Sequence, residues 1–294
     1  MKKTIFITGA TGMLGKKMVE AFSGDEQYRV YGVSRSKQSS ENVIYENIDL
    51  LNENAIMTSL EKIKPEVVIQ CAANVNLEEC EKDQEAAYQL HVGSTKILAS
   101  YSPNTTKFVY ISTDSVFDGR KGDYTEDDPV NPLNYYSKSK YLGEQAALEN
   151  NKNTLVVRTN IYGINSARGR SLVEWAMNEL KNDREINGFD DVYFNPVYVG
   201  QLAKIIKKLL EETKISGTIN IASAQKVSKY EFLKALAEVF GFNTELIHPV
   251  SIDTMPSKFE RPKDTALNTD KLKKAIGEVP TLKKGLCEMS KSLR

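Results

Sequence analysis

Short apolar runs alternate with longer helical patterns along the first half of the chain, and this rhythm restricts the fold more than any other feature. The runs lie at residues 5–7, 29–33, 43–48, 67–69, 108–111 and 155–157, and the helical patterns at 12–22, 53–63, 85–101 and 136–150. The runs are continuously apolar, as in parallel strands that helices cover on both faces. The sequence therefore predicts an α/β fold with a doubly wound parallel sheet.

Three glycines follow the first apolar run, in the spacing GxxGxxG (TGATGMLG, residues 8–15). Glycines at such positions permit a tight turn, the approach of a pyrophosphate and close helix packing. The start of the next helix offers free N–H groups to an anion. The alternative is a glycine-rich turn without a ligand. We predict a Rossmann sheet whose dinucleotide contacts include Gly9, Thr11, Gly12, Met13 and Leu14.

The second predicted strand ends without an acidic residue, in the sequence VSRSK (33–37). A carboxylate there binds the ribose 2′-hydroxyl of NAD, whereas a basic residue accommodates the 2′-phosphate of NADP. Ser34 and Arg35 therefore predict NADP(H), with NAD(H) left open, and a solvated basic loop is the alternative. Asp49, followed by Leu50, is a candidate for the adenine site or an ordinary helix-entry residue.

A tyrosine and a lysine four residues apart open the helical pattern at 136–150. Tyr136 and Lys140 lie on one helical face, and Thr113 ends the strand before that helix. Reduction of a ketone adds a hydride to carbon and a proton to oxygen. We expect Tyr136 to give the proton, Lys140 to lower the pKa of Tyr136, and Thr113 to hold the carbonyl oxygen. A YxxxK pattern alone is common on solvated helices, so the prediction depends on its occurrence with the glycine loop.

The strand–helix rhythm breaks after Arg158. Residues 159–196 are irregular around one helical pattern at 172–180, and a helix at 199–211 and a strand at 218–221 then resume the sheet. Two further helical patterns follow, at 229–240 and 269–276. We expect residues 1–158 and 197–223 to form the dinucleotide-binding domain, and 159–196 and 224–294 a smaller, discontinuous α/β lobe that binds substrate. The cleft between the two is the expected substrate site.

Five segments of the chain carry a resemblance to a known family. They are 8–15 (TGATGMLG), 112–119 (STDSVFDG), 132–140 (PLNYYSKSK), 143–144 (GE) and 261–269 (RPKDTALNT). With them the chain resembles the extended short-chain dehydrogenases/reductases, and among these the dTDP-4-dehydrorhamnose reductase family. The similarity spans nearly the whole chain.

The resemblance implies a set of site residues. Thr113, Tyr136 and Lys140 would form the catalytic triad, and Tyr136 and Lys140 would also contact the cofactor. The segment 71–74 would contribute the cofactor contacts Cys71, Ala72, Ala73 and Asn74. A nucleotide-sugar site would involve the second lobe, and the candidate substrate residues are Asp114, Val116, Asn160, Trp175, Tyr198 and Arg261. Core or surface packing is an equal alternative for Trp175 and Tyr198.

Three positions depart from the family pattern. Cys71 stands where the family usually has histidine, His91 where it usually has asparagine, and Ser115 where it usually has tyrosine. The role of position 91 is therefore open. The favoured interpretation is that His91 is a helix residue whose hydrogen bonds are satisfied within the protein.

The composition limits the kinds of binding partner that we expect for this chain. The 39 basic and 39 acidic residues balance, so bulk charge gives no large basic face for nucleic acid. Three cysteines without CxxC spacing and two distant histidines predict neither a disulfide framework nor a zinc site. No apolar run approaches the length of a membrane span, and we expect a cytoplasmic protein. The resemblance allows a homodimer and a magnesium ion, although no ligand cluster requires the metal.

Together these features predict NADP(H)-dependent reduction of a nucleotide-activated 4-keto-6-deoxy sugar, in deoxysugar and cell-surface polysaccharide biosynthesis. One alternative keeps the fold but changes the chemistry, as in nucleotide-sugar epimerases. A second alternative, from a different class, is a non-catalytic NADP-binding subunit that resembles the regulatory subunit of methionine adenosyltransferase.

Overall fold

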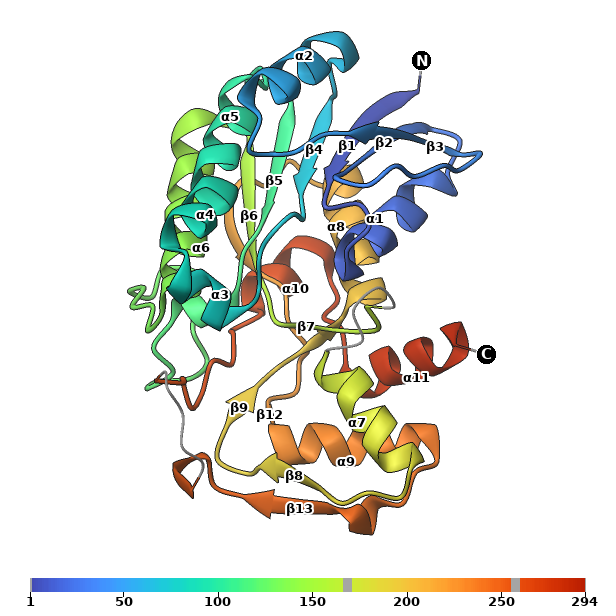
Figure 1. Cartoon of the computed structure of the whole chain (residues 1–294), viewed down its shortest axis with the longest axis vertical. Helices are drawn as coiled ribbons and strands as arrows, with labels where there is room; N and C mark the ends of the chain where they lie inside the picture. Colours follow the sequence, from blue (N-terminus) through green and yellow to red (C-terminus); the bar gives the residue numbers. More distant parts are fainter. Residues whose placement is uncertain (1, 166–170, 255–259, 294) are drawn as a thin grey trace.

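Seven parallel strands form the central sheet in the order β11-β6-β5-β4-β1-β2-β3 (Figure 1). The computed structural model describes residues 2–165, 171–254 and 260–293. The strands are β1 (Lys3–Thr8), β2 (Tyr28–Ser34), β3 (Val43–Asn47), β4 (Val67–Gln70), β5 (Lys107–Ile111), β6 (Thr154–Arg158) and β11 (Gly217–Asn220). The strand order reverses between β1 and β4, which is where open α/β sheets bind ligands. The predicted doubly wound parallel Rossmann sheet is confirmed.

Helices cover both faces of this sheet (Figure 1). One face is covered by α1 (Met13–Ser23) and α8 (Val199–Glu212), the other by α2 (Glu53–Ile63), α5 (Ser94–Ser100) and α6 (Tyr135–Asn150). Successive strand residues point to opposite faces. Ile5 and Ile7 therefore join the core under α1 and α8, whereas Phe6 joins the core under α2 and α5. Burial on both faces explains the continuous apolar runs of β1, β4, β5 and β6.

The helix expected at 85–101 is interrupted. It consists of α4 (Gln84–Tyr88), a π-helical turn η1 (Gln89–Gly93) and α5. A further helix that was not predicted, α3 (Leu77–Lys82), precedes it. Asn76 caps α3 by accepting two backbone N–H groups, and Asp83 ends α3 and caps α4. These capping residues explain why one apolar pattern gives several short helices. Single π-helical turns are frequent at functional sites.

The second lobe lies below the sheet in Figure 1 and contains short paired strands and helices. The strands are β7 (Ile161–Tyr162), β8 (Ile186–Phe189), β9 (Tyr193–Phe194), β10 (Val197–Tyr198), β12 (Val227–Ser228) and β13 (Ile247–Val250). The helices are α7 (Leu172–Lys181), α9 (Lys229–Phe240) and α11 (Leu282–Ser292), and α10 (Asp270–Ile276) lies beside α8 and β11. Single 3-10 turns occur at Asp114–Val116, Thr244–Leu246 and Ile252–Thr254.

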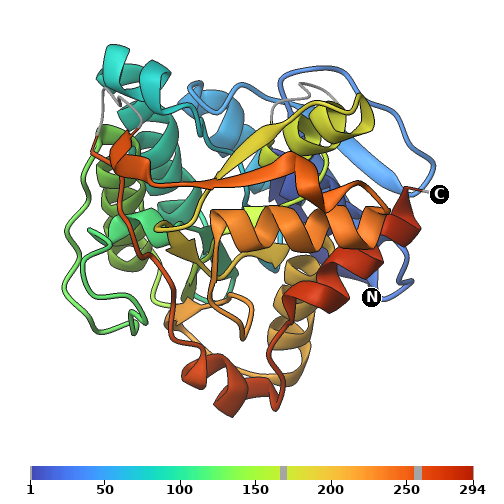
Figure 2. The same cartoon turned by 90° about the horizontal axis from the view of Figure 1, so that it is seen from below.

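The lobe shares one hydrophobic core with the sheet. Leu236 on α9 and Leu286 on the unpredicted α11 belong to the same buried cluster as Met18 on α1 and Leu202 on α8. Figure 2 shows α9 and α11 side by side across the lower face of the molecule. The exact domain boundaries remain a prediction. None of the helices within the described residues is long and apolar enough to cross a membrane.

Candidate active site

The glycine loop after β1 lies against the loop after β4. Gly9 has a φ of +63°, and a Cβ added to it would lie 2.8 Å from the backbone of Ala72. A Cβ on Gly15 would lie 2.0 Å from the Gly9 carbonyl oxygen, so α1 packs tightly on the turn. No side chain caps α1, and its first turn contains no acidic residue. Its first N–H groups are therefore available to an anion at the point where the strand order reverses.

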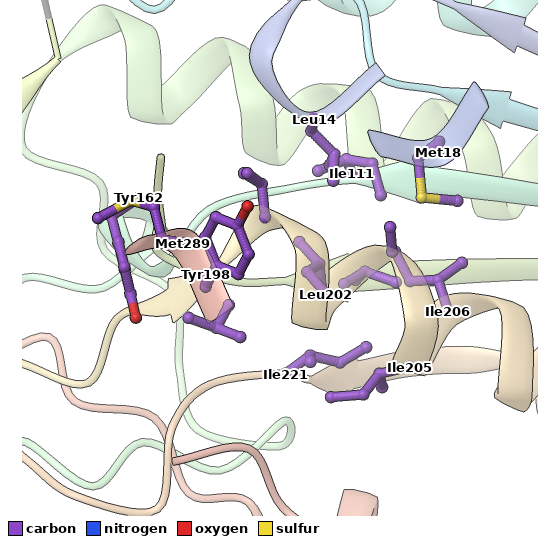
Figure 3. Packing of buried hydrophobic residues seen from close by; sticks show 14 of the residues in the cluster. Leu14, Met18, Ile111, Tyr162, Tyr198, Leu202, Ile205, Ile206, Ile221 and Met289 are labelled. Carbon is purple, nitrogen blue, oxygen red and sulfur yellow. The ribbon is translucent and has the colours of Figure 1, made fainter. Parts of the chain in front are cut away.

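The Leu14 side chain, at the start of α1, is buried beneath the glycine loop. It is 5% exposed and lies in the core with Met18, Ile111 and Leu202 (Figure 3). Met13 packs partly buried against the same cluster, with its sulfur close to Gly163. The Leu14 side chain anchors α1 to the sheet, and the predicted contact of Leu14 with a dinucleotide stays a prediction.

The end of β2 presents an accessible cation. The Arg35 guanidinium is exposed and forms no ion pair or hydrogen bond with any other described residue. Ser34 donates its hydroxyl hydrogen to the Ser36 carbonyl oxygen at 2.6 Å. Asp49 is exposed and accepts the Leu51 N–H at 3.1 Å, as in a turn, whereas Leu50 is buried in the core. Arg35 is thus free to meet a phosphate, and the Leu50 side chain is not available to a ligand.

The three predicted catalytic residues converge at the carboxyl end of β5. Asn134 caps α6 by accepting the Ser137 N–H at 2.9 Å, which places Tyr136 in the first turn of the helix. Lys140, one turn later, is 3% exposed and donates from Nζ to the Ile111 carbonyl oxygen at 2.6 Å. Thr113 follows two residues after Ile111, and its hydroxyl lies against the Tyr136 phenol. The sequence therefore placed all three groups at the correct edge of the sheet.

Burial has the largest effect on the pKa values of Tyr136 and Lys140. Burial raises the pKa of the Tyr136 phenol above its usual value, the Thr113 hydroxyl opposes the rise, and the Asp114 carboxylate adds to it. Burial also lowers the pKa of the Lys140 amine to about 7, against the opposing effect of Glu144. The expected lowering of the Tyr136 pKa by Lys140 is not seen in this arrangement: burial sets the direction of the shift, and the Lys140 amine donates to the Ile111 carbonyl.

The Asp114 carboxylate connects separate segments of the chain through hydrogen bonds. The side chain is 1% exposed, and one carboxylate oxygen accepts the Thr113 hydroxyl at 3.1 Å and the Ser115 hydroxyl at 3.3 Å. The other oxygen accepts the Asn160 amide at 2.8 Å and the Thr265 hydroxyl at 2.5 Å. Asp114 therefore joins the end of β5 to two separate segments of the chain. Its carboxylate is engaged by side chains of the protein and positions Thr113, and the substrate contact of Asp114 stays a prediction.

Four other predicted substrate residues have different environments. Val116 is fully buried in a small core with Phe117, and Tyr198 is buried, with its hydroxyl 3.2 Å from that of Ser292. Figure 3 shows Tyr198 inside the core beside Tyr162. Both side chains pack inside hydrophobic cores, which is the alternative left open for Tyr198, and the burial of Val116 gives no support to its predicted substrate contact. Trp175 on α7 is 41% exposed and Arg261 is exposed, so both can meet a ligand.

The cofactor segment after β4 remains beside the catalytic residues. Cys71 lies near Lys140, and burial raises the pKa of the Cys71 thiol to about 12, which keeps it protonated. The Ala72 N–H points to the Thr8 hydroxyl at 3.4 Å. The thiol is therefore in its neutral form at physiological pH. Within the described residues, no three His, Cys, Asp or Glu side chains gather in a way that could hold a metal ion.

Sequence reasoning missed two charged features of the site. Glu144 and Arg158 form a buried ion pair beside Lys140. The Lys229 amine lies 3.2 Å from the centre of the Phe194 ring, and no described residue gives it an ion pair or a hydrogen bond. Burial lowers the pKa of Lys229 to about 8, and the nearby charges that act on it are Asp114 and Arg261. No spacing signal could reveal Lys229, because the packing of α9 on β9 creates its environment.

Comparison with known proteins identifies the family. The family model described as the RmlD substrate binding domain matches residues 1–294. The chain is 30% identical over 295 residues to the methionine adenosyltransferase 2 subunit beta of Mus musculus, covering 97% of this chain and 86% of that protein. It is 27% identical over 290 residues to the dTDP-4-dehydrorhamnose reductase of Aggregatibacter actinomycetemcomitans, covering 94% of both.

Solved structures agree with this assignment. The crystal structure of a Bacillus anthracis dTDP-4-dehydrorhamnose reductase in complex with NADP has a TM-score of 0.87 and 28% identity, and the match covers 99% of this chain and 100% of that one. A UDP-glucose 4-epimerase from Thermotoga maritima has a TM-score of 0.83 at 20% identity, a likeness of fold alone. The resemblance in the sequence is confirmed, and the chain belongs to the RmlD substrate-binding-domain family.

Proposed function

We propose that this protein is an NADPH-dependent reductase that acts on a nucleotide-activated 4-keto-6-deoxy sugar. The observation that carries the proposal is the convergence of Thr113, Tyr136 and Lys140 beside the glycine loop, at the carboxyl edge of the sheet. Relatives that are named dTDP-4-dehydrorhamnose reductases support this choice of reaction. The rhamnose precursor carried by dTDP is therefore the first substrate to test.

The residues present fit a dinucleotide. The uncapped start of α1 suits the pyrophosphate, and a Cβ on Gly9 would clash at the place where the turn approaches the segment 71–74. The buried hydroxyls of Ser137 and Thr159 have no hydrogen-bond partner in the described structure, as expected of groups that meet a ligand. Arg35 supplies the cation that favours a 2′-phosphate, so NADPH is the preferred cofactor and NADH the weaker one.

The side chains then have distinct roles in a ketone reduction. Bound NADPH supplies the hydride that is added to the carbonyl carbon. The Tyr136 phenol, protonated because of its raised pKa, gives its proton to the carbonyl oxygen. The Thr113 hydroxyl, whose hydrogen is directed to Asp114 in this structure, would turn to donate to that oxygen when substrate binds. In its charged form, Lys140 stabilises the phenolate that remains and binds the cofactor ribose. The carbonyl thus becomes a secondary alcohol.

The second lobe offers cations to an anionic substrate. Lys229 is desolvated and has no acidic partner within hydrogen-bond distance among the described residues, and Arg261 is exposed nearby. The Asp114 carboxylate acts on Lys229 only at longer range, because its hydrogen-bonding positions are occupied by four other side chains. Two such cations suit the diphosphate of a nucleotide sugar, because a desolvated charge needs a counter-charge.

The decisive experiment follows NADPH oxidation with a panel of 4-keto-6-deoxy sugars linked to different nucleoside diphosphates. We expect turnover with at least one member of the panel and identification of the product as the corresponding alcohol by nuclear magnetic resonance. Tight NADPH binding without oxidation by any member of the panel would contradict the reductase proposal.

A second candidate function is supported by the relatives themselves. The methionine adenosyltransferase 2 beta subunits are 30% identical to this chain, against 27% for the Aggregatibacter reductase. In that case the protein would bind NADP and act as a regulatory subunit without turnover. A pull-down and calorimetric titration with a methionine adenosyltransferase catalytic subunit tests this role, and stable binding that changes the kinetics of that subunit would favour it.

A further inference from the structure

His91 lies in the π-helical turn between α4 and α5 and is completely buried. Its Nε2 accepts the backbone N–H of Asn74 at 2.9 Å, which ties the turn to the segment after β4. Its Nδ1 lies 2.8 Å from the Ser139 hydroxyl on α6. One ring therefore bridges the predicted cofactor segment and the helix that carries Tyr136 and Lys140.

The hydrogen-bond partners fix which nitrogen carries the proton. Because the Asn74 N–H can only donate, Nε2 has no hydrogen and the ring is neutral with its hydrogen on Nδ1. The Ser139 hydroxyl donates its single hydrogen to the Tyr136 carbonyl oxygen at 2.9 Å, so it accepts from Nδ1. Burial, together with the charge of Lys140, lowers the pKa of His91 to about 3, which agrees with a neutral ring. The donor and the acceptor of each hydrogen bond from Asn74 through His91 and Ser139 to Tyr136 are thus determined.

The π-helical turn and α6 also make close contact around the His91 ring. The His91 ring meets the Tyr136 ring edge to face, with centroids 6.0 Å apart and an interplanar angle of 80°. A Cβ on Gly143 would lie 2.6 Å from the His91 carbonyl oxygen, so α6 approaches the π-helical turn closely. That carbonyl accepts the Thr95 hydroxyl at 2.6 Å. His91 therefore contacts Tyr136 both through Ser139 and through its ring.

We propose that His91 is a positioning residue with two separable arms. The Nε2 arm holds the segment 71–74 in the shape that receives the cofactor, and the Nδ1 arm, through Ser139, holds the first turn of α6 and thereby the Tyr136 phenol. This inference rests on the proposed function, because it assigns the two arms to cofactor binding and to proton transfer. His91 touches neither reacting atom and acts through its neighbours.

Two substitutions separate the arms, because asparagine and glutamine reach the positions of different ring nitrogens. In His91→Asn the side-chain amide can still donate to Ser139, but the Asn74 N–H loses its acceptor. In His91→Gln the side-chain oxygen can still accept from Asn74, but Ser139 loses its donor. We expect His91→Asn to raise the NADPH dissociation constant about tenfold with little change in kcat. We expect His91→Gln to lower kcat about tenfold with a nearly unchanged NADPH dissociation constant.

Ser139→Ala tests the Nδ1 arm from its other end, and it should reproduce the kcat loss of His91→Gln. The double variant His91→Gln/Ser139→Ala should be no slower than either single variant, since both interrupt the same path. Ser102→Ala is the matched control, because Ser102 is also buried and also donates to a helix carbonyl, that of Leu98, at 2.7 Å. It should change neither quantity.

The nitrogen resonances of His91 in the wild-type protein give a test that needs no variant. The proposal requires the hydrogen on Nδ1 at neutral pH, and a hydrogen on Nε2 would overturn it. Suppose that the wild-type protein binds and oxidises NADPH. If His91→Asn and His91→Gln then changed the NADPH dissociation constant and kcat in the same way, this inference alone would be overturned. A wild-type protein that neither binds nor oxidises NADPH would overturn the proposed function, and with it the assignment of the two arms.

Discussion

Arg158 at the end of β6 and Glu144 on α6 form a buried ion pair in which two guanidinium nitrogens face two carboxylate oxygens. The Nε atom lies 3.1 Å from Oε1 and the Nη2 atom lies 2.8 Å from Oε2, and the side chains are 5% and 0% exposed. The Ser112 hydroxyl also donates to Glu144. Because Lys140 lies one turn before Glu144, this pair fixes the part of α6 that presents the amine.

Replacement of Glu144 tests the structural weight of this pair. Glu144→Gln leaves the Arg158 charge buried without a counter-charge, and we expect the free energy of unfolding to fall by about 3–5 kcal/mol. Urea denaturation followed by circular dichroism measures it. Glu288→Gln is the matched control, because Glu288 pairs with Lys204 at the surface, where such a pair contributes less than about 1 kcal/mol. Equal losses in the two variants would contradict the structural role of the buried pair.

Lys140 links activity to stability. Its folded-state pKa of about 7 lies below the usual value of 10.5, so the folded protein disfavours the charged amine. The penalty is complete below about pH 7, declines between about pH 7 and 10.5, and vanishes above that range. We expect Lys140→Met to raise Tm at about pH 6 more than at about pH 10, while NADPH oxidation is lost. A Tm difference that is the same at both pH values would contradict the buried, shifted amine.

Tyr136 carries the proton transfer in the proposed mechanism. Tyr136→Phe keeps the ring that packs against His91 but removes the acidic hydroxyl. We expect kcat to fall by about 100-fold or more, with an unchanged NADPH dissociation constant measured by fluorescence. Tyr135→Phe, which removes the neighbouring phenol on the same helix, is the control and should retain activity. Full activity of Tyr136→Phe would remove this residue from the mechanism.

Arg35 is predicted to distinguish the two cofactors. Arg35→Ala removes a charge-assisted contact to the 2′-phosphate, and we expect NADPH affinity to fall about 10- to 100-fold while NADH affinity stays nearly constant. Calorimetric titration with both cofactors measures the difference. Arg29→Ala is the control, because Arg29 is also exposed on β2 but lies near its opposite end. Equal losses for NADPH and NADH in Arg35→Ala would show that Arg35 does not read the phosphate.

The sheet could be predicted because its signals are local. Continuous apolar runs, the glycine turn and the spacing of Tyr136 and Lys140 depend on residues that are near each other in sequence. The environment of each side chain is not local, which is why Val116 and Tyr198 were expected in a pocket and lie in the core. The bridge through His91 joins residues 17 and 48 positions apart, and no periodicity encodes such a bridge.

Lys229 provides the test of the substrate side of the cleft. If its unpaired, desolvated amine meets the diphosphate, Lys229→Met removes one charge-assisted contact, and the KM for the nucleotide sugar rises about 10- to 100-fold. The NADPH dissociation constant should not change, because the glycine loop belongs to the other domain. Lys234→Met is the control, since Lys234 also lies on α9 but donates to the Thr244 carbonyl.

Lys229→Met should also be more stable than the wild type below about pH 8. Burial lowers the pKa of Lys229 to about 8, so below this pH the wild type carries a charge that folding disfavours and that the substitution removes. A Lys229→Met variant with an unchanged KM but raised stability would show that the amine is a partly buried cation without a ligand and that Arg261 or another group binds the anion.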